Sequence, residues 1–240
     1  MKTNIFILAA ASMLTLGACS VRLIDQKEVN GEMMEKTIDV KDFNALRIKN
    51  SADVIYTVSD TFSVRVKTRG GYLKNMDFQN EDSLLTIDFH QGISKNERVW
   101  NINQTYDGSC TIYISAPSLR GIRIEGAADF TCKDTIVTDA FKVSVAGAGD
   151  VEIAGIRART VEFTLAGAGD MKALLDRVEH SDLSIAGAGD MDIAFRDCSK
   201  AGVSVAGAGD VELRGTLGTL SKNIAGVGEI DTDKLTLTGK

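Results

Sequence analysis

Acidic residues recur at a fixed spacing in the second half of the chain. Four of them end identical Ala-Gly-Ala-Gly-Asp pentapeptides, which follow one another every 20 residues. A weaker copy on each side of this series also ends in an acid. The resulting row is Asp129, Asp150, Asp170, Asp190, Asp210 and Glu229. Carboxylates are preferred ligands of Ca²⁺, so the five aspartates are a candidate calcium site.

Two interpretations of this row stay open. In the first, calcium neutralises carboxylates that would otherwise repel one another by about 1 kcal/mol per neighbouring pair in water. In the second, each aspartate accepts hydrogen bonds from the backbone N–H groups of its own corner, as in an Asx turn. We favour the second, because the spacing differs from the period of about nine residues that the calcium-binding glycine-aspartate repeat has.

The repeat does not gather the residues that an enzyme would need. The chain has two histidines, His90 and His180, which lie far apart in the sequence. A catalytic site is singular, whereas the aspartates are repeated, and the glycines around Ala148 precede a strand pattern and not the helix of a phosphate loop. We therefore predict that the protein is not an enzyme and has no cofactor. The alternative is a carbohydrate-active or carbohydrate-binding β-helix protein with a carboxylate pair near residues 90–108.

The period of the repeat predicts how the acids are positioned. Residues on both sides of each pentapeptide alternate between apolar and polar, as a strand with one buried face does. Stacked in register, they form apolar columns, one of which is Val151, Met171, Met191 and Val211. Such columns are typical of a parallel β-helix, so we predict an all-β solenoid with about 20 residues per coil.

Each pentapeptide predicts a tight corner between two strands. Glycine adopts positive φ angles without a steric cost, so Gly147 and Gly149 are expected to make the sharp turn in the first copy. The neighbouring alanines are expected to fill the inside of the corner.

The first residues have the pattern of an export signal. Lys2 precedes the apolar run Ile5–Leu16, and Leu16-Gly17-Ala18-Cys19 resembles a bacterial lipobox. We predict a lipoprotein signal peptide over residues 1–18, cleavage before Cys19, lipidation of Cys19 and attachment to a membrane through this anchor. Residues 19–42 are expected to form a tether.

One domain is expected over residues 43–240. Strand patterns of uneven spacing predict irregular N-terminal coils over residues 43–120, and the regular repeats occupy residues 121–240. The polar stretch from His90 to Gly108, which contains Trp100, is expected to be a long loop or a protruding hairpin. The formal net charge of -6 argues against nucleic acid as a partner.

Three cysteines remain besides Cys19. Cys110 and Cys132 are 22 residues apart, about one coil, which would allow a disulfide between neighbouring layers if their side chains face the same way. The alternative, which we favour, is that they are buried thiols in apolar columns. Cys198 would then be a third thiol.

The run Val143–Val151, with the strand Leu46–Ile48, the turn Ser51–Val54 and the strand Phe62–Val66, resembles the head GIN domain family of Bacteroidetes lipoproteins. This family was first catalogued as a domain of unknown function, and its members are described as auto-transporter adhesins. The resemblance covers residues 43–240 and implies a right-handed parallel β-helix at the cell envelope. It brings no catalytic residues.

The resemblance implies an outer-membrane lipoprotein that presents its solenoid as an adhesin or a surface scaffold. Its expected partners are a glycan or another envelope protein. Residues 20–23 lack the acidic run that resembles a surface-export signal in these bacteria, so both the periplasmic and the surface-facing side stay open. Self-association is a further expectation, because an uncapped solenoid end can pair with a second chain. Lys234 and Lys240 would oppose it.

Overall fold

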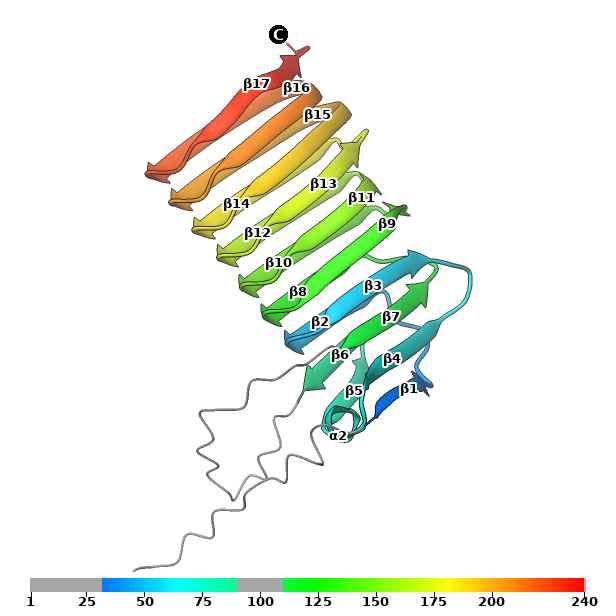
Figure 1. The fold of residues 1–240 in the computed structure, drawn as a ribbon. Helices are drawn as coiled ribbons and strands as arrows, with labels where there is room; N and C mark the ends of the chain where they lie inside the picture. Colours follow the sequence, from blue (N-terminus) through cyan, green and yellow to red (C-terminus); the bar gives the residue numbers. More distant parts are fainter. Residues whose placement is uncertain (1–31, 90–109, 240) are drawn as a thin grey trace, which may run out of the picture.

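The structure, a computed structural model, describes residues 32–89 and 110–239 and consists almost entirely of β-strands. Figure 1 shows a stack of coils with the first strands at one end and the C-terminus at the other. The predicted signal peptide, Cys19 and the stretch from His90 to Gly108 lie outside the described residues. Within the described part, no helix is long and apolar enough to cross a membrane.

The regular coils present two faces of parallel strands. One face contains β8 (Gly121–Gly126), β10 (Ala140–Gly147), β12 (Thr160–Gly167), β14 (His180–Gly187) and the second halves of β15 (Met191–Gly207) and β16 (Val211–Gly226). The other contains β9 (Asp129–Val137), β11 (Val151–Arg157), β13 (Met171–Asp176), the first halves of β15 and β16, and β17 (Ile230–Leu237). The predicted all-β parallel solenoid is confirmed.

The register follows from the repeat. Ala146 pairs with Ala166, and Val151 pairs with Met171, so equivalent residues lie side by side in successive coils. Within the regular coils the inward side chains are enclosed: Val145, Leu165 and Val205 are 0% exposed. Burying each of these side chains contributes about 1.5–3 kcal/mol. A one-residue slip would turn every such side chain outward, so the apolar columns hold the register.

The N-terminal coils do not follow the order of the sequence. The strands β2 (Ala45–Asn50) and β3 (Asp53–Val58) pair with β8 and β9 on one side. On their other side they pair with β6 (Leu84–Phe89) and β7 (Thr111–Ala116). The coil made by β2 and β3 therefore lies between two segments that come later in the chain. The uneven strand patterns of residues 43–120 predict irregular coils here but not this order.

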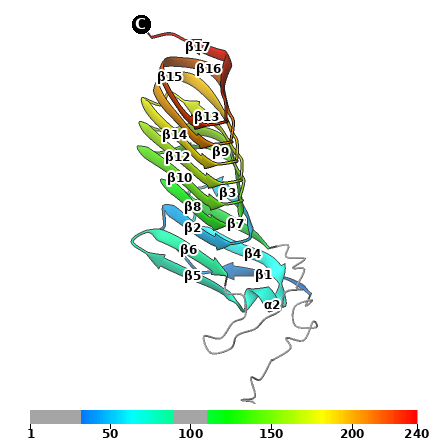
Figure 2. The ribbon, with the colours of Figure 1, turned by 90° about the vertical axis from the view of Figure 1, so that its left-hand side faces the viewer.

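Antiparallel strands cover the N-terminal end of the stack, as Figure 2 shows from the side. β1 (Met33–Ile38) pairs with β4 (Ser63–Arg69), β4 pairs with β7, and β5 (Met76–Glu81) pairs with β6. The short helix α2 (Gly70–Leu73) connects β4 to β5. These antiparallel pairs lie beyond the last parallel coil and close the stack at its N-terminal end.

The prediction of a tether over residues 19–42 is wrong for the part of that range that lies in the N-terminal sheet. Residues 33–38 of that range form β1, which pairs along its whole length with β4. The sequence does not predict this strand, because β1 is exposed from Met33 to Thr37 and shows no alternation of buried and exposed positions.

Candidate functional site

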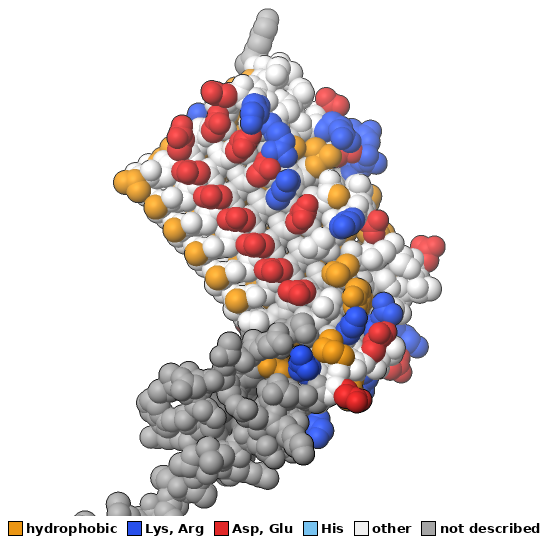
Figure 3. Space-filling view, in the orientation of Figure 1, with side chains coloured by type: hydrophobic (Ala, Val, Ile, Leu, Met, Phe, Trp, Pro, Cys, Tyr) orange, Lys and Arg blue, Asp and Glu red, His pale blue; other side chains and the backbone are white. Residues whose placement is uncertain are grey.

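Each acid of the row lies where the chain leaves a pentapeptide corner and enters the next strand. Asp150, for example, follows β10 and directly precedes β11. The acids from Asp129 to Glu229 are all exposed, and Figure 3 shows acidic side chains in a straight row across the coils. A parallel row of hydrophobic side chains runs along the edge of the solenoid. The fixed period thus turns distant residues into neighbours.

The carboxylates of the row accept hydrogen bonds from the backbone of the following coil. Oδ1 of Asp129 accepts the N–H of Asp150 at 3.0 Å, and each later aspartate of the row accepts the N–H of the next acid in the same way. The N···O distances are 2.9, 3.3, 2.8 and 2.8 Å for the donors Asp170, Asp190, Asp210 and Glu229. The predicted role as an acceptor is right. The prediction that the N–H belongs to the aspartate's own corner is wrong, because the stacking brings the next coil's N–H to the carboxylate.

Main-chain hydrogen bonds also link the corners. Ala148 donates its N–H to the carbonyl of Gly126 in the preceding coil at 2.9 Å. Val151 donates its N–H to the carbonyl of Asp170 in the following coil at 2.8 Å. The corner backbone therefore finds its partners in the neighbouring coils, as buried peptide groups require.

The two glycines of a pentapeptide are needed for different reasons. Gly147 has a φ of +147°, and a Cβ there would lie 1.9 Å from the carbonyl oxygen of Gly126. Gly149 is required because there is no room for a side chain: a Cβ there would lie 2.0 Å from the carbonyl oxygen of Ala128. The alanines do not fill the inside of the corner, since Ala146 and Ala148 are exposed while Gly149 is buried. That expectation was wrong because the backbone of the neighbouring coil occupies the inside.

The row extends to one further acid, Asp53, which the 20-residue period does not predict. Asp53, at the start of β3, pairs in register with Asp129 and is exposed. The similarity of Ser51-Ala52-Asp53 to the later corners was the available signal. It was not enough to place Asp53, because the intervening strands β4 to β7 hide which coil follows β3.

The geometry of the row fits a calcium site poorly. Ca²⁺ takes six to eight oxygen ligands that converge on one point. The acids instead form a line with one carboxylate per coil, and each Oδ1 from Asp129 to Asp210 already accepts a hydrogen bond. Among residues 32–89 and 110–239, no group of three or more His, Cys, Asp or Glu side chains could hold a metal ion.

One broad face of the solenoid carries small outward side chains. Partly exposed hydroxyl residues occupy the same position in successive coils, and exposed alanines follow two residues later. The hydroxyl column is Ser144, Thr164, Ser184 and Ser204. Because these side chains are short, the backbone of successive strands lies close to the surface of this face.

A groove of about 420 Å³ lies at the second corner of the coils, between the two faces. Its lining includes Arg157, Arg159, Arg177 and Glu179, with the apolar side chain of Val137 59% exposed beside them. Arg159 donates from Nε to Oδ1 of Asp139 at 3.1 Å. No pattern in the sequence marks these arginines, because they are not repeated in every coil.

A buried carboxylate holds two of the groove's arginines in place. The Asp176 side chain is 6% exposed, and its Oδ2 accepts two hydrogen bonds from Arg157, that from Nε at 3.0 Å. Arg177 lies on its other oxygen, with Nε 3.5 Å from Oδ1. The hydrogen bond from Arg157 lowers the pKa of Asp176 against the opposing effect of burial, and the charges of Arg157, Arg177 and Arg196 add to the lowering.

The described residues do not assemble a familiar catalytic group. His180 is exposed in part, and its Nε2 lies 3.0 Å from Oδ2 of Asp182 on the outer face of β14. The carboxylate pair considered near residues 90–108 lies outside the described part of the chain. Cys110, Cys132 and Cys198 are free and buried, and burial raises the pKa of the Cys132 thiol to about 11.

The fold and its corners define a class of protein: a parallel β-solenoid whose coils are joined by glycine corners and hydrogen-bonded acids. The family described as "Putative auto-transporter adhesin, head GIN domain" matches residues 42–194 and 175–238. The chain belongs to this family. The resemblance predicted from the pentapeptides is thereby confirmed. The family's description names an adhesin and no enzymatic activity.

Solved structures have the same fold at low sequence identity. A crystal structure named as a putative adhesin from Bacteroides fragilis is 20% identical, with a TM-score of 0.64 over 83% of this chain and 96% of that one. One named as a putative lipid binding protein from Parabacteroides distasonis is 19% identical, with a TM-score of 0.64 over 84% and 96%. A putative adhesin from the same species is 18% identical, with a TM-score of 0.56 over 84% and 97%. No match was found among curated proteins.

Proposed function

We propose that this protein is a non-catalytic lipoprotein of the cell envelope whose solenoid serves as an adhesin or a surface scaffold. The observation that supports this most is the repetition of outward side chains in register, seen in the acid row and in the hydroxyl column. A partner with its own repeat, such as a polysaccharide, can contact several coils at once, and several weak contacts then add to a stable one. Membership of a family named for adhesion agrees with this proposal.

A glycan array tests the adhesin role. The chain carrying Cys19→Ser, which removes the proposed lipid site, would be applied with calcium and again with EDTA. We expect binding to a limited set of polymeric glycans, with binding that rises with glycan length. Absence of binding in both buffers would contradict a glycan partner, and release of shortened glycans would contradict the non-catalytic assignment. Binding that EDTA abolishes would indicate that a divalent metal ion takes part in glycan binding.

The proposed anchor needs a separate experiment in cells. Metabolic labelling with an alkyne fatty acid should mark the wild-type chain and not the Cys19→Ser variant. Equal labelling of both would contradict lipidation at Cys19. Protease treatment of intact cells then separates the two orientations, because a surface-facing chain is cleaved and a periplasmic one is protected.

A second candidate function is carbohydrate binding at the arginine groove. The groove combines guanidinium donors with the exposed side chain of Val137, and sugar sites join polar groups to apolar contacts. Arg159→Ala should weaken binding of an acidic glycan. The matched control is Arg65→Ala, since Arg65 is also exposed and also bonds a carboxylate, that of Glu35 at 2.9 Å. Equal effects of both variants would argue against the groove.

A further inference from the structure

The C-terminal end of the solenoid forms a step one strand high. β17 pairs with the first half of β16, over Val211–Leu217. The second half of β16, Thr219–Gly226, pairs with β15 on one side only, and no strand of the described residues pairs with its other side. One face of the solenoid therefore extends one strand further than the other, and the shorter face ends in free backbone donors and acceptors.

The apolar columns are uncovered at this end. Ile224 continues the column of Val205 and is 46% exposed, whereas Val205 is 0% exposed. Leu237 continues the column of Leu217 on the other face and is 53% exposed, against 0% for Leu217. An exposed strand edge with apolar side chains is a template for pairing with another strand.

Each face places one charge among these apolar ends. Lys222 pairs in register with Val203, a buried residue of an inward column, so Lys222 occupies an inward position on the shorter face. On the longer face, a bulge in the register between Glu212 and Arg214 leaves Thr232 and Asp233 opposite the buried Leu213. Lys222 and Asp233 are both exposed. The end thus carries a cation over one sheet and an anion over the other.

We infer that a second copy of this chain docks on the C-terminal end, with β17 of each copy pairing with Thr219–Gly226 of the other. A two-fold axis along the strand direction exchanges the two faces, so the longer face of one copy fills the step of its partner. The two faces run in opposite directions, so each new pair is antiparallel. The interface is isologous and closes after two copies.

The charges select this arrangement over pairing of β16 with itself. Register-matched antiparallel pairing of Thr219–Gly226 with the same strand of a second copy would bring Lys222 toward its own counterpart. When β17 of each copy pairs with Thr219–Gly226 of the other, each Lys222 instead faces the β17 of the second copy, which carries Asp231 and Asp233. An inward charge protects a strand edge from unrelated partners. Here it leaves the edge open to a strand with a complementary acid.

Charge exchange tests the arrangement directly. Sedimentation of the Cys19→Ser chain over a range of concentrations should give a reversible dimer. Lys222→Glu should be monomeric, since each acid then faces an acid, and Asp233→Lys should be monomeric for the opposite reason. Mixed in equal amounts, the two variants should form a heterodimer, because both contacts then pair opposite charges. Lys133→Glu, which alters an exposed lysine of β9 away from this end, should leave the dimer unchanged.

Three results would contradict this dimer, each in a different way. A wild-type chain that stays monomeric at every concentration would exclude the docking. An Asp233→Lys variant that dimerises like the wild type would indicate pairing of β16 with itself. Failure of the mixed variants to associate would show that Lys222 and Asp233 do not face each other. Because no glycan is present, these results do not depend on the proposed adhesin function.

Discussion

The acid row allows a quantitative test at Asp190. Its neighbours in the row are Asp170 and Asp210, and its Oδ1 accepts the N–H of Asp210 at 2.8 Å. Asp190→Asn keeps an oxygen acceptor and removes the charge, whereas Asp190→Ala removes both. The two variants therefore separate the repulsion along the row from the hydrogen bond between coils.

The repulsion between neighbouring carboxylates weakens as the salt concentration rises, whereas the strength of the hydrogen bond between coils changes much less. With strands about 4.8 Å apart, two neighbouring carboxylates about 5 Å from Asp190 repel it by roughly 1.7 kcal/mol in water without salt. Screening reduces this to roughly 0.9 kcal/mol at about 0.15 M and to roughly 0.3 kcal/mol at about 1 M ionic strength. Exchanging a charged acceptor for a neutral one costs about 1 kcal/mol.

Asp190→Asn should therefore change the sign of its effect with salt. We expect the variant to be more stable than the wild type by about 0.7 kcal/mol at very low salt, nearly equal at about 0.15 M, and less stable by about 0.7 kcal/mol at about 1 M. Asp190→Ala should lie below Asp190→Asn at every salt concentration by about 1 kcal/mol, since it also loses the acceptor.

Urea unfolding of the Cys19→Ser chain, followed by circular dichroism at low and high NaCl, measures these differences. Asp60→Asn is the matched control, because Asp60 is an exposed acid in the turn between β3 and β4 and lies outside the row. A stability difference between Asp190→Asn and the wild type that is independent of salt would contradict repulsion along the row, and so would the same salt dependence in the control.

Further outcomes are expected at the corners and in the core. Gly167→Ala should lower the stability by at least about 3 kcal/mol, because a Cβ would lie 1.8 Å from a carbonyl oxygen of the preceding coil; Ala168→Gly, at an exposed position, should change the melting temperature far less. The lowered pKa of Asp176 adds stability that is present above about pH 4 and is lost as the pH falls through the pKa of the folded state. Arg157→Met should weaken this acid dependence and cost about 1–3 kcal/mol at pH 7, because it leaves the Asp176 carboxylate without the hydrogen bonds from Arg157; pH-dependent melting would measure both effects. In the Cys19→Ser chain the buried thiols, with the pKa of Cys132 raised to about 11, should react with a thiol reagent at pH 8 only after urea unfolds the chain; rapid reaction of the native Cys19→Ser chain would contradict their burial.

The regular coils could be predicted because the repeat encodes their contacts. Residues at the same position of successive repeats have the same character, so the pairing of Val151 with Met171 follows from the sequence alone. The apolar columns then follow from alternation. The direction of the aspartate hydrogen bonds could not be predicted in this way, because the pattern does not tell whether a carboxylate reaches its own corner or the next coil.

The N-terminal part was harder to predict because its contacts do not follow from a period. The coil of β2 and β3 lies between β6 and β8 although β6 comes after it in the chain, and nothing local in Ala45–Val58 marks that order. The arginine groove was missed for a related reason. Arg157 and Arg177 are brought together by a buried acid, Asp176, whose burial no local pattern indicates.

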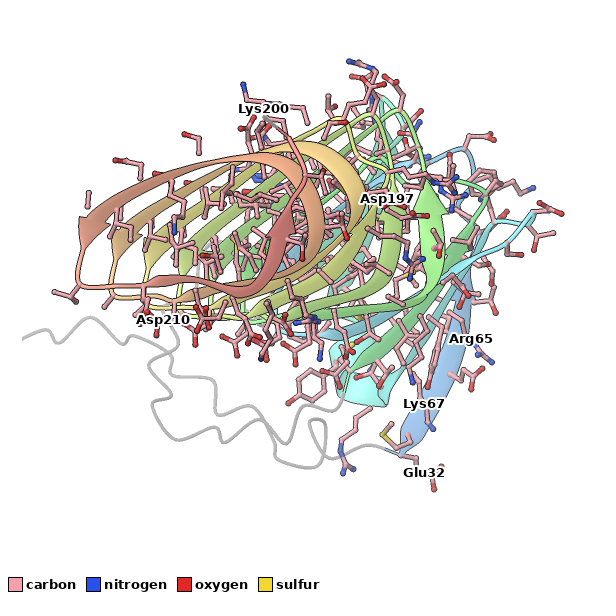
Figure 4. The ribbon with its side chains drawn as sticks, turned by 90° about the horizontal axis from the view of Figure 1, so that it is seen from above. Glu32, Arg65, Lys67, Asp197, Lys200 and Asp210 are labelled. Carbon is pink, nitrogen blue, oxygen red and sulfur yellow. The ribbon has the colours of Figure 1, made fainter. Side chains whose placement is uncertain are left out.

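β1 and β17 lie at opposite ends of the stack, so the number of coils between them sets the length of the molecule. Seen from above, Asp210 and Lys200 lie on opposite sides of the flattened coil, and the coils lie behind one another roughly along the viewing direction (Figure 4). A chain held at its N-terminus presents β17 farthest from the point of attachment, and each coil adds about 4.8 Å to that distance. Two copies joined at their C-terminal ends would have their attachments facing away from each other.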